Sequence, residues 1–421
     1  MYIGKIIYKV STALLALATF SLPSQAAESV KIGAIYPLTG QLASYGQGAQ
    51  KALQCAASLI NDVHNEINHP LAQQGGLKNL PGKPKIEVVF ADAPDPQGAV
   101  AAAQRLISQD KVVALTGSYA SSITEPASRI AEQHKIPFVN GDSSASNLTE
   151  RGFKYFFRTT PLEADITAEA VRMAKEFAKS TGADTFTAAV VHEDSQFGQS
   201  SANGLKAALD KVGASAVTEV SYRAQAADLT GVALKLRTAN PDVVFLSSYV
   251  PDAVLLTKTL KQMNFFPKAL IGLNGTNVPA YLSGLGTDAE GVMGISLFPA
   301  DLGEKKPVTG QINAFCKQLT GQALDDSSSR ALVGFLVLVD AINRAGTSDS
   351  EAVRSALAAT DLKAQDIIMP WRGVKFNATT QQNELGSVAF QQIKGSAFQT
   401  IWPPELAVTK PVWPAPAWNA R

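Results

Sequence analysis

The sequence has few of the residues on which metal and redox sites depend. Among its 421 residues there are 2 cysteines and 4 histidines. The histidines do not cluster: His64 and His69 have the wrong spacing for one helical face, and His134 and His192 stand alone. No Cys-x-x-Cys motif occurs. We therefore expect neither a metal centre nor a dithiol redox site.

The chain also lacks an excess of charge of either sign. It carries 37 basic and 36 acidic residues and no run of basic residues. This balance argues against nucleic acid, or an anionic membrane surface, as a partner. Beyond the N-terminal residues, no segment reaches the roughly 20 apolar residues that a transmembrane helix needs. We therefore expect no membrane span in the mature chain.

The first 26 residues are typical of a signal peptide. Lys5 and Lys9 give a positive start, 10–22 is mostly apolar, and Ser24-Gln25-Ala26 fits a small-x-small cleavage site. We expect an exported protein that is cut after Ala26. A membrane anchor is the alternative, although the apolar run is short for a span. No cysteine lies near the cleavage site, so a lipid anchor is not expected.

Export to an oxidising compartment permits a disulfide between Cys55 and Cys316. Both residues, however, lie within apolar helical patterns, where a cysteine is usually a small buried hydrophobic residue. We therefore expect two buried thiols rather than a disulfide bond.

Short apolar runs alternate with helical patterns along the chain, which predicts an α/β fold. In the first half, strands are expected at 30–36, 86–91, 112–115 and 136–139, with helices between them. This order implies a parallel sheet with helices on both faces. After an extended crossover at 156–161, strands and helices alternate again. The strands are expected at 185–191, 216–222, 243–248, 270–272 and 291–298.

The C-terminal part does not continue this alternation of strands and helices. Helices near Arg330 are expected to pack on the first domain, which makes that domain discontinuous in sequence. The segments 374–376 and 387–393 look like a closing hairpin, and a Pro-rich, irregular tail follows. We therefore divide the chain into a signal peptide (1–26), a first domain (27–158 plus 299–368) and a second domain (159–298 plus 369–421).

Two hydroxyl-rich turns follow successive strands between residues 111 and 151. The first turn precedes a helix, whose free N–H groups and dipole favour an anion such as a carboxylate. Ligands of open α/β sheets bind at the carboxyl ends of the strands. We predict the anion-binding half of a small-molecule site here, although serine also caps helices routinely. The candidate hydroxyl donors are Ser121, Ser122, Ser143 and Ser144.

Other side chains at the strand ends complete the candidate site. Asp142 is either a helix-side cap or an acceptor for a cation. His192 ends a buried strand and either contacts a ligand or has a structural role. Four aromatic residues stand where a strand leads into a helix and predict cleft walls for an apolar ligand, although single aromatics often only pack. They are Tyr45, Tyr119, Phe197 and Tyr249.

No catalytic motif accompanies these residues. The sequence has no Gly-x-Ser-x-Gly elbow and no Gly-rich loop that ends in Lys-Ser or Lys-Thr. The polar residues at the strand ends do not form a nucleophile with a base. We therefore expect a binding protein rather than an enzyme, and no cofactor.

Several motifs resemble the type I periplasmic solute-binding proteins, the branch typified by the leucine/isoleucine/valine-binding protein of ABC transporters. The resemblance covers nearly the whole mature chain and implies two Rossmann-like domains with parallel sheets, hinged by three crossovers. The motifs that carry it are Ile32 to Gly40 with Tyr45-Gly46, Gly75-Gly76 with Pro81-Gly82-Lys83, Asp95-Pro96 with Ala99, Gly117 to Ser122, and Leu148 to Gly152 with Phe157-Arg158-Thr159.

The resemblance also implies roles for the polar residues. It assigns Ser121 and Ser144 to the carboxylate of an amino-acid ligand, and the backbone carbonyl of Asp142 to its ammonium group. One departure matters: Asn274 stands where amino-acid binders place a glutamate for the ammonium. A neutral amide is a poor partner for a buried cation. Either Asp142 replaces the glutamate, or the ligand lacks an ammonium group.

The aromatic residues fit the same resemblance. Phe197 and Tyr249 match residues of the second domain, and Tyr45 and Tyr119 match positions that line the side-chain pocket. The predicted function is a periplasmic receptor that captures a branched-chain amino acid or other small carboxylate and delivers it to an inner-membrane ABC permease. The alternative is a sensor of amides or aromatic acids that is not coupled to transport.

Overall fold

The protein is an α/β molecule built on two separate sheets. The computed structural model describes residues 1–2, 4, 29–299 and 301–420. The predicted cleavage site and most of the signal peptide lie outside these residues. The two sheets contain five and seven strands, and a small third sheet contains two.

The first sheet is parallel throughout, with the strand order β2-β1-β3-β4-β5. Its strands β1, β3 and β4 are short, apolar and buried, as expected where helices cover both faces. The predicted crossover supplies the fifth strand, which pairs with β4. The elements are β1 (Val30–Tyr36), α1 (Ala43–Asn61), β2 (Ile86–Asp92), α2 (Pro96–Ser108), β3 (Ala114–Gly117), α3 (Ser121–Gln133), β4 (Phe138–Asn140) and β5 (Phe156–Arg158).

The second sheet has the strand order β14-β13-β10-β9-β8-β6-β7. Strands β6 to β10 pair in parallel, and two antiparallel strands extend one edge. The elements that continue the β-α alternation are α4 (Glu163–Ser180), β6 (Thr187–Glu193), α5 (Gln196–Val212), β7 (Ser215–Tyr222), α6 (Thr230–Ala239), β8 (Val243–Ser247), α7 (Val250–Gln262), β9 (Ala269–Gly272), α8 (Pro279–Leu285) and β10 (Met293–Ser296).

The predicted closing hairpin is wrong. Strand β12 (Gly373–Lys375) pairs with β11 (Asp361–Lys363), whereas β13 (Ala389–Lys394) forms a hairpin with β14 (Ala397–Trp402). The turn of that hairpin is Gly395-Ser396, and both residues have positive φ, 59° and 61°. Two-residue turns with positive φ match the right-handed twist of paired strands. The sequence interpretation overlooked this turn and therefore missed β14.

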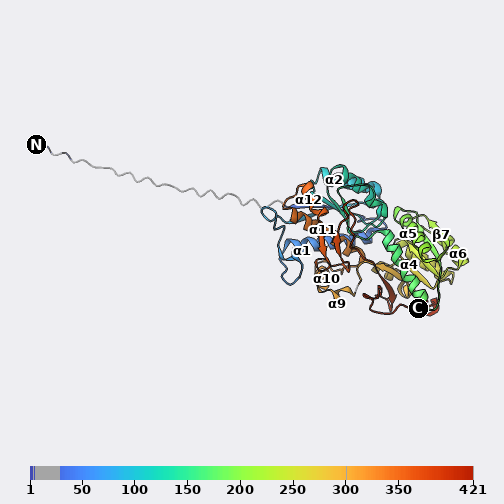
Figure 1. The fold of residues 1–421 in the computed structure, drawn as a ribbon. Coiled ribbons are helices and arrows are strands. Elements are labelled where there is room, and N and C mark those ends of the chain that lie inside the picture. Colours follow the sequence, from blue (N-terminus) through green and yellow to red (C-terminus); the bar gives the residue numbers. More distant parts are fainter. Residues whose placement is uncertain (3, 5–28, 300, 421) are drawn as a thin grey trace.

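Four helices connect the second sheet to these strands: α9 (Leu302–Lys305), α10 (Pro307–Thr320), α11 (Asp326–Ala345) and α12 (Ser350–Ala358). Helix α11 is buried along nearly its whole length and packs on α1, β3 and β4. Figure 1 shows α1, α2, α11 and α12 in one half of the molecule and α4, α5 and α6 in the other. Within the described residues, no single helix is long and apolar enough to cross a membrane.

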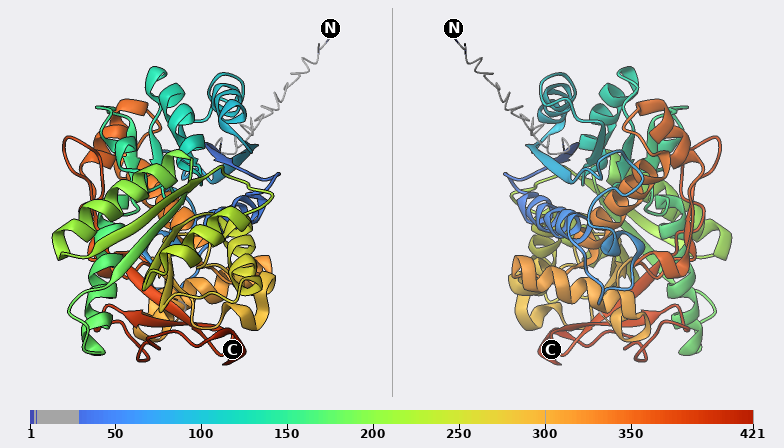
Figure 2. Two further views of the ribbon diagram at one scale, coloured as in Figure 1. Left: turned by 90° about the vertical axis from the view of Figure 1, so that its right-hand side faces the viewer. Right: turned by 90° about the vertical axis from the view of Figure 1, so that its left-hand side faces the viewer.

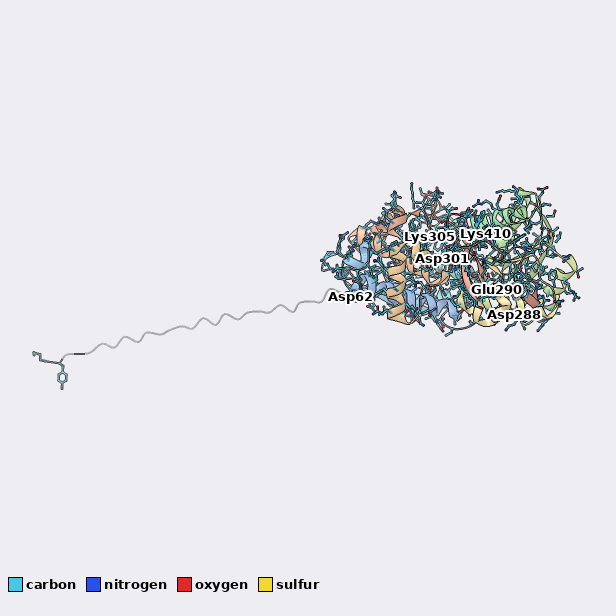
Figure 3. The ribbon with its side chains drawn as sticks, turned by 90° about the horizontal axis from the view of Figure 1, so that it is seen from below. Asp62, Asp288, Glu290, Asp301, Lys305 and Lys410 are labelled. Carbon is cyan, nitrogen blue, oxygen red and sulfur yellow. A yellow bond between two sulfur atoms is a disulfide. The ribbon has the colours of Figure 1, made fainter. Side chains whose placement is uncertain are left out.

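The C-terminal tail is fixed on the half that contains the second sheet. The Thr400 hydroxyl donates to Asp301 Oδ1 at 2.8 Å, and Lys305 Nζ donates to the Leu406 carbonyl at 3.1 Å. Trp418 Nε1 donates to the Phe265 carbonyl at 3.1 Å. Asp301 and Lys305 are labelled in Figure 3, and the red C-terminal segments run along the bottom of Figure 2. The tail also contacts β13 at the antiparallel edge of the sheet, where the Val412 N–H donates to Gln392 Oε1 at 2.7 Å.

The expectation of two free thiols is wrong, because Cys55 and Cys316 form a disulfide with Cα atoms 5.3 Å apart. Cys55 lies on α1 and Cys316 on α10, and the two helices pack side by side. Both residues are buried, as the helical patterns indicated. The patterns showed which face of each helix is buried, but they carry no information about which helices meet.

We predict that breaking this disulfide destabilises the protein. The bond closes a sequence separation of 261 residues, and removing a disulfide typically costs about 2–4 kcal/mol, more for long loops. The denaturant midpoint of the protein should therefore fall in the presence of a reductant. In the double variant Cys55→Ala, Cys316→Ala the reductant should have no effect. An unchanged midpoint for the reduced wild type would contradict the prediction.

Candidate functional site

A cavity lies between the two sheets, where the loops after β3 and β4 face the loops after β6, β8 and β9. Its free volume is about 20 Å³, enough for about one water molecule. The structure brings most of the predicted site residues together around it. Eight of the ten line this cavity: Tyr119, Ser121, Asp142, Ser143, Ser144, Phe197, Tyr249 and Asn274. Tyr45 and Ser122 lie elsewhere.

Tyrosine rings close the cleft between the two halves. Tyr45 stacks on Tyr119 with ring centroids 3.9 Å apart, and Tyr249 contacts both rings. The Tyr119 hydroxyl donates to Asn274 Oδ1 at 2.9 Å, and the Val250 N–H donates to the Tyr45 hydroxyl at 3.2 Å. Tyr45 therefore supports the cavity wall from behind. Both hydrogen bonds join residues that follow strands of different sheets.

The serines of the two turns differ in what they contact. Ser121 begins α3, but the N-cap residue is Ala120, which has no capping side chain, so the capping alternative does not apply there. Instead, Ser121 Oγ accepts from the Ala145 N–H at 3.3 Å. Ser143 Oγ contacts the carbonyls of Ser118 and Tyr119 and thereby ties the two turns together. Of these two serines, Ser121 has the greater capacity left for a ligand.

Ser144 contacts a buried carboxyl at the start of α4. Its hydroxyl donates to Glu163 Oε2 at 2.5 Å, whereas Glu163 Oε1 is buried without a partner among the described residues. Burial raises the pKa of Glu163 to about 7, and the hydrogen bond from Ser144 opposes this shift. The sequence interpretation missed Glu163, since a glutamate at the beginning of a helix is usually exposed.

An ion pair that the sequence interpretation also missed lines the cavity. Arg330 Nη2 and Asp326 Oδ2 are 3.1 Å apart, and both side chains are buried. Asp326 also accepts from the side chain of Asn277 at 3.0 Å. Arg330 Nη1 donates to the backbone carbonyl of Asp142 at 2.8 Å, the group that the resemblance assigned to an ammonium. The i, i+4 spacing of Asp326 and Arg330 was the available signal.

The carboxyl of Asp142 is the most distinctive group of the cavity. Its Oδ2 accepts from the Tyr36 hydroxyl at 3.1 Å, and its Oδ1 is buried with no partner among the described residues. Burial raises the pKa of Asp142 to about 7, although Arg330 and the hydrogen bond from Tyr36 lower it. A cation placed at Oδ1 would satisfy this oxygen and favour the ionised form.

The remaining candidates have other roles. His192 Nδ1 is 2.9 Å from the Glu193 carbonyl, and His192 is not among the residues that line the cavity, which fits the structural alternative. Within the described part of the chain, no group of three or more His, Cys, Asp or Glu side chains could hold a metal ion.

The fold and the cleft define a ligand-binding protein made of two α/β halves. The chain belongs to the periplasmic binding protein family, whose family model matches residues 29–397. It is 28% identical to "Leu/Ile/Val-binding protein homolog 7" of Brucella abortus over 407 residues, which cover 94% of this chain and 98% of that protein. The predicted family and the predicted α/β fold class are confirmed.

Solved structures share the fold. The leucine-binding protein LivK of Thermotoga maritima has a TM-score of 0.74 at 21% identity and covers 89% of this chain and 99% of its own. A solute-binding protein of an ABC transporter from R. palustris, solved with benzoate, has a TM-score of 0.74 at 17% identity and covers 93% of this chain and 98% of its own. The family to which the chain belongs is thus one of binding proteins, as the sequence predicted.

We predict that Asp142 makes stability depend on pH. Its pKa is about 7 in the folded protein and 3.8 ordinarily, so the folded state holds a proton that the unfolded state has released. This stabilisation is fully present below about pH 4 and is lost as the pH rises through 7. One pKa unit is worth about 1.4 kcal/mol. As the pH rises from 4 to 8.5, the free energy of unfolding of Asp142→Asn should therefore increase by up to about 4 kcal/mol relative to that of the wild type.

Denaturant unfolding of wild type and variant at both pH values measures this difference. The control is Asp210→Asn, on an exposed position of α5, which should follow the wild-type profile. Parallel pH profiles for wild type and Asp142→Asn would show that Asp142 is ionised in the folded protein throughout.

Proposed function

We propose that the protein is the substrate-binding component of an ABC transporter. Its signal peptide directs it to the periplasm, where it captures a branched-chain amino acid or a similar small carboxylate and delivers it to an inner-membrane permease. The observation that carries this proposal is the buried, half-satisfied carboxyl of Asp142, which lies in the cleft beside the serine hydroxyls and aromatic rings. This arrangement suits a ligand with both an anionic and a cationic group.

Each ligand group has a partner in the cavity. The carboxylate fits the Ser121 hydroxyl and the N–H groups of Ser121 and Ser122, which begin α3 and have no carbonyl partner within the helix. The ammonium fits Asp142 Oδ1, which takes over the role of the glutamate that Asn274 replaces. The apolar side chain fits the surface made by Phe197 and Ile295, which line the opposite side of the cavity.

Ligand entry requires movement of the two halves. A free volume of about 20 Å³ is far too small for an amino acid, which contains many more atoms than one water molecule. The hydrogen bonds from Tyr119 to Asn274 and from Val250 to Tyr45 must break as the cleft opens. Ligand then shifts the open–closed equilibrium by the contacts that it makes with both halves.

A second candidate function is a sensor of aromatic acids or amides that is not coupled to transport. Two observations favour such a ligand: Asn274 is neutral and already accepts from Tyr119, and Asp142 has a pKa of about 7. A protonated Asp142 can donate a hydrogen bond, so it can also pair with an acceptor oxygen of a ligand that has no ammonium group. Permease and ATPase genes beside the gene for this protein would favour transport.

We predict that Asp142→Asn separates the two ligand classes. If the ligand is an amino acid, the variant should bind it at least about 30-fold more weakly, because losing a buried charged partner costs 2 kcal/mol or more. Binding of an aromatic acid such as benzoate should change little. Calorimetric titration of the leader-free protein with leucine, isoleucine and benzoate measures both effects.

The control for this experiment is again Asp210→Asn, which should bind every ligand as the wild type does. Leucine affinity that is the same in Asp142→Asn and wild type would rule out the assignment of the ammonium to Asp142. If no amino acid, aromatic acid or short-chain acid binds the wild type, the proposal of a small carboxylate ligand fails.

A further inference from the structure

Tyr249 separates two cavities in the cleft. The site described above lies on one side of it. On the other side, a cavity of about 140 Å³ is enclosed by the loops after β1, β2 and β3 and by those after β6, β7 and β8. Tyr119 and Ser121 line the first cavity, whereas the alternating residues Ala120 and Ser122 line the second. The second cavity has room for a short chain of heavy atoms.

The lining of the second cavity is acidic. Its residues lie in the described part of the chain and include Asp95, Glu193 and Asp252, but no lysine, arginine or histidine. Two of these carboxyls have structural tasks. Asp95 Oδ1 accepts from the Gly98 N–H at 2.7 Å and caps α2, and Asp252 Oδ2 accepts from the Gln225 N–H at 2.9 Å.

Glu193 is the exception. It ends β6, and only 1% of it is exposed. Its Oε1 accepts from the Ser195 hydroxyl, and its Oε2 accepts no hydrogen bond from any described residue. Burial and, to a smaller extent, the nearby carboxylates Asp252 and Asp194 together raise the pKa of Glu193 to about 8. A buried carboxyl without a cationic partner therefore faces a cavity that is large enough for a ligand group.

We propose that the second cavity binds a cationic group at the far end of the ligand, with Glu193 as its acceptor. The inference rests on the proposed function and specifies the ligand as an amino acid whose side chain ends in an ammonium or guanidinium group. The head group lies at Ser121 and Asp142, and the side chain passes Tyr249 to reach Glu193. A metal ion is less suitable, because the described residues contain no group of three metal-ligating side chains.

The aromatic residues between the cavities support this path. Tyr45, Tyr119 and Tyr249 form one cluster of rings, and the electron-rich faces of such rings attract alkylammonium and guanidinium groups. The alkyl part of the side chain would pack on the same rings. Ser122 and Ser195 add hydroxyl oxygens that accept hydrogen bonds from the cationic group.

Matched ligand pairs test the proposal. Ornithine and norleucine differ in a terminal ammonium against a methyl group, and lysine and 2-aminoheptanoic acid form a longer pair. In calorimetric titration of the leader-free protein at pH 7, at least one cationic member should bind 10-fold or more tightly than its apolar partner. Glu193→Gln should abolish that preference, and its binding of the apolar partner shows that the variant is folded.

Asp210→Asn is the matched control and should keep the wild-type preference. Equal affinities within both pairs in the wild type would overturn this inference and leave the proposed function intact. A preference that survives Glu193→Gln would also overturn it. If neither member of either pair binds the wild type, this inference fails, whereas the titrations with leucine and isoleucine decide the amino-acid version of the proposed function.

Discussion

The buried guanidinium of Arg158 holds together the parts of the chain that form the cleft. It donates to the carbonyl of Ala145 at 2.7 Å and to Gln382 Oε1 at 2.6 Å, and it also contacts the Ser143 carbonyl and the Thr149 hydroxyl. A single side chain thus fixes the turn after β4 and the segment that returns towards β13. A buried charge persists only when it is paired or fully hydrogen-bonded, and removing its partners costs several kcal/mol. The position of the binding turn therefore depends on Arg158.

The electrostatics of the cleft follow from a surplus of buried carboxyl groups over buried cations. Arg330 pairs with Asp326, and Arg158 is occupied by carbonyl and amide oxygens. Asp142 and Glu163 therefore remain without a cation of their own, and burial raises the pKa of each to about 7. Near neutral pH these groups are partly protonated, which removes most of the cost of burying them. The cleft is thus suited to ligands that bring positive charge.

Local sequence patterns predicted most of the helices and strands. The features that the sequence interpretation missed depend on contacts between segments that are distant in the sequence. Strand β1 has its predicted bounds, and the serine turns lie at the carboxyl ends of their strands because a parallel sheet allows no other place for them. The Cys55–Cys316 bond, the β13–β14 hairpin and the Arg330–Asp326 pair depend instead on which elements meet. The periodicity of apolar residues indicates which face of a helix is buried, but not which element packs against that face. Ser122 shows that the sequence pattern did not resolve single residues. Ser121 lines the first cavity, whereas its neighbour Ser122 lines the second.

The two cavities make different demands on a ligand. At pH 7, ionising a carboxyl with the pKa of Asp142, about 7, costs almost nothing, so the first cavity accepts both charged and neutral head groups. Ionising Glu193, with a pKa of about 8, costs about 1.4 kcal/mol. A hydrogen bond to a charged group contributes about 1.5–3 kcal/mol. This contribution exceeds the cost of ionising Glu193, so binding of a cation in the second cavity is still favourable. In the binding mode that we propose, discrimination between ligands that share a head group therefore depends on the acidic cavity beyond Tyr249, where an apolar ligand end would leave Glu193 without a cationic partner.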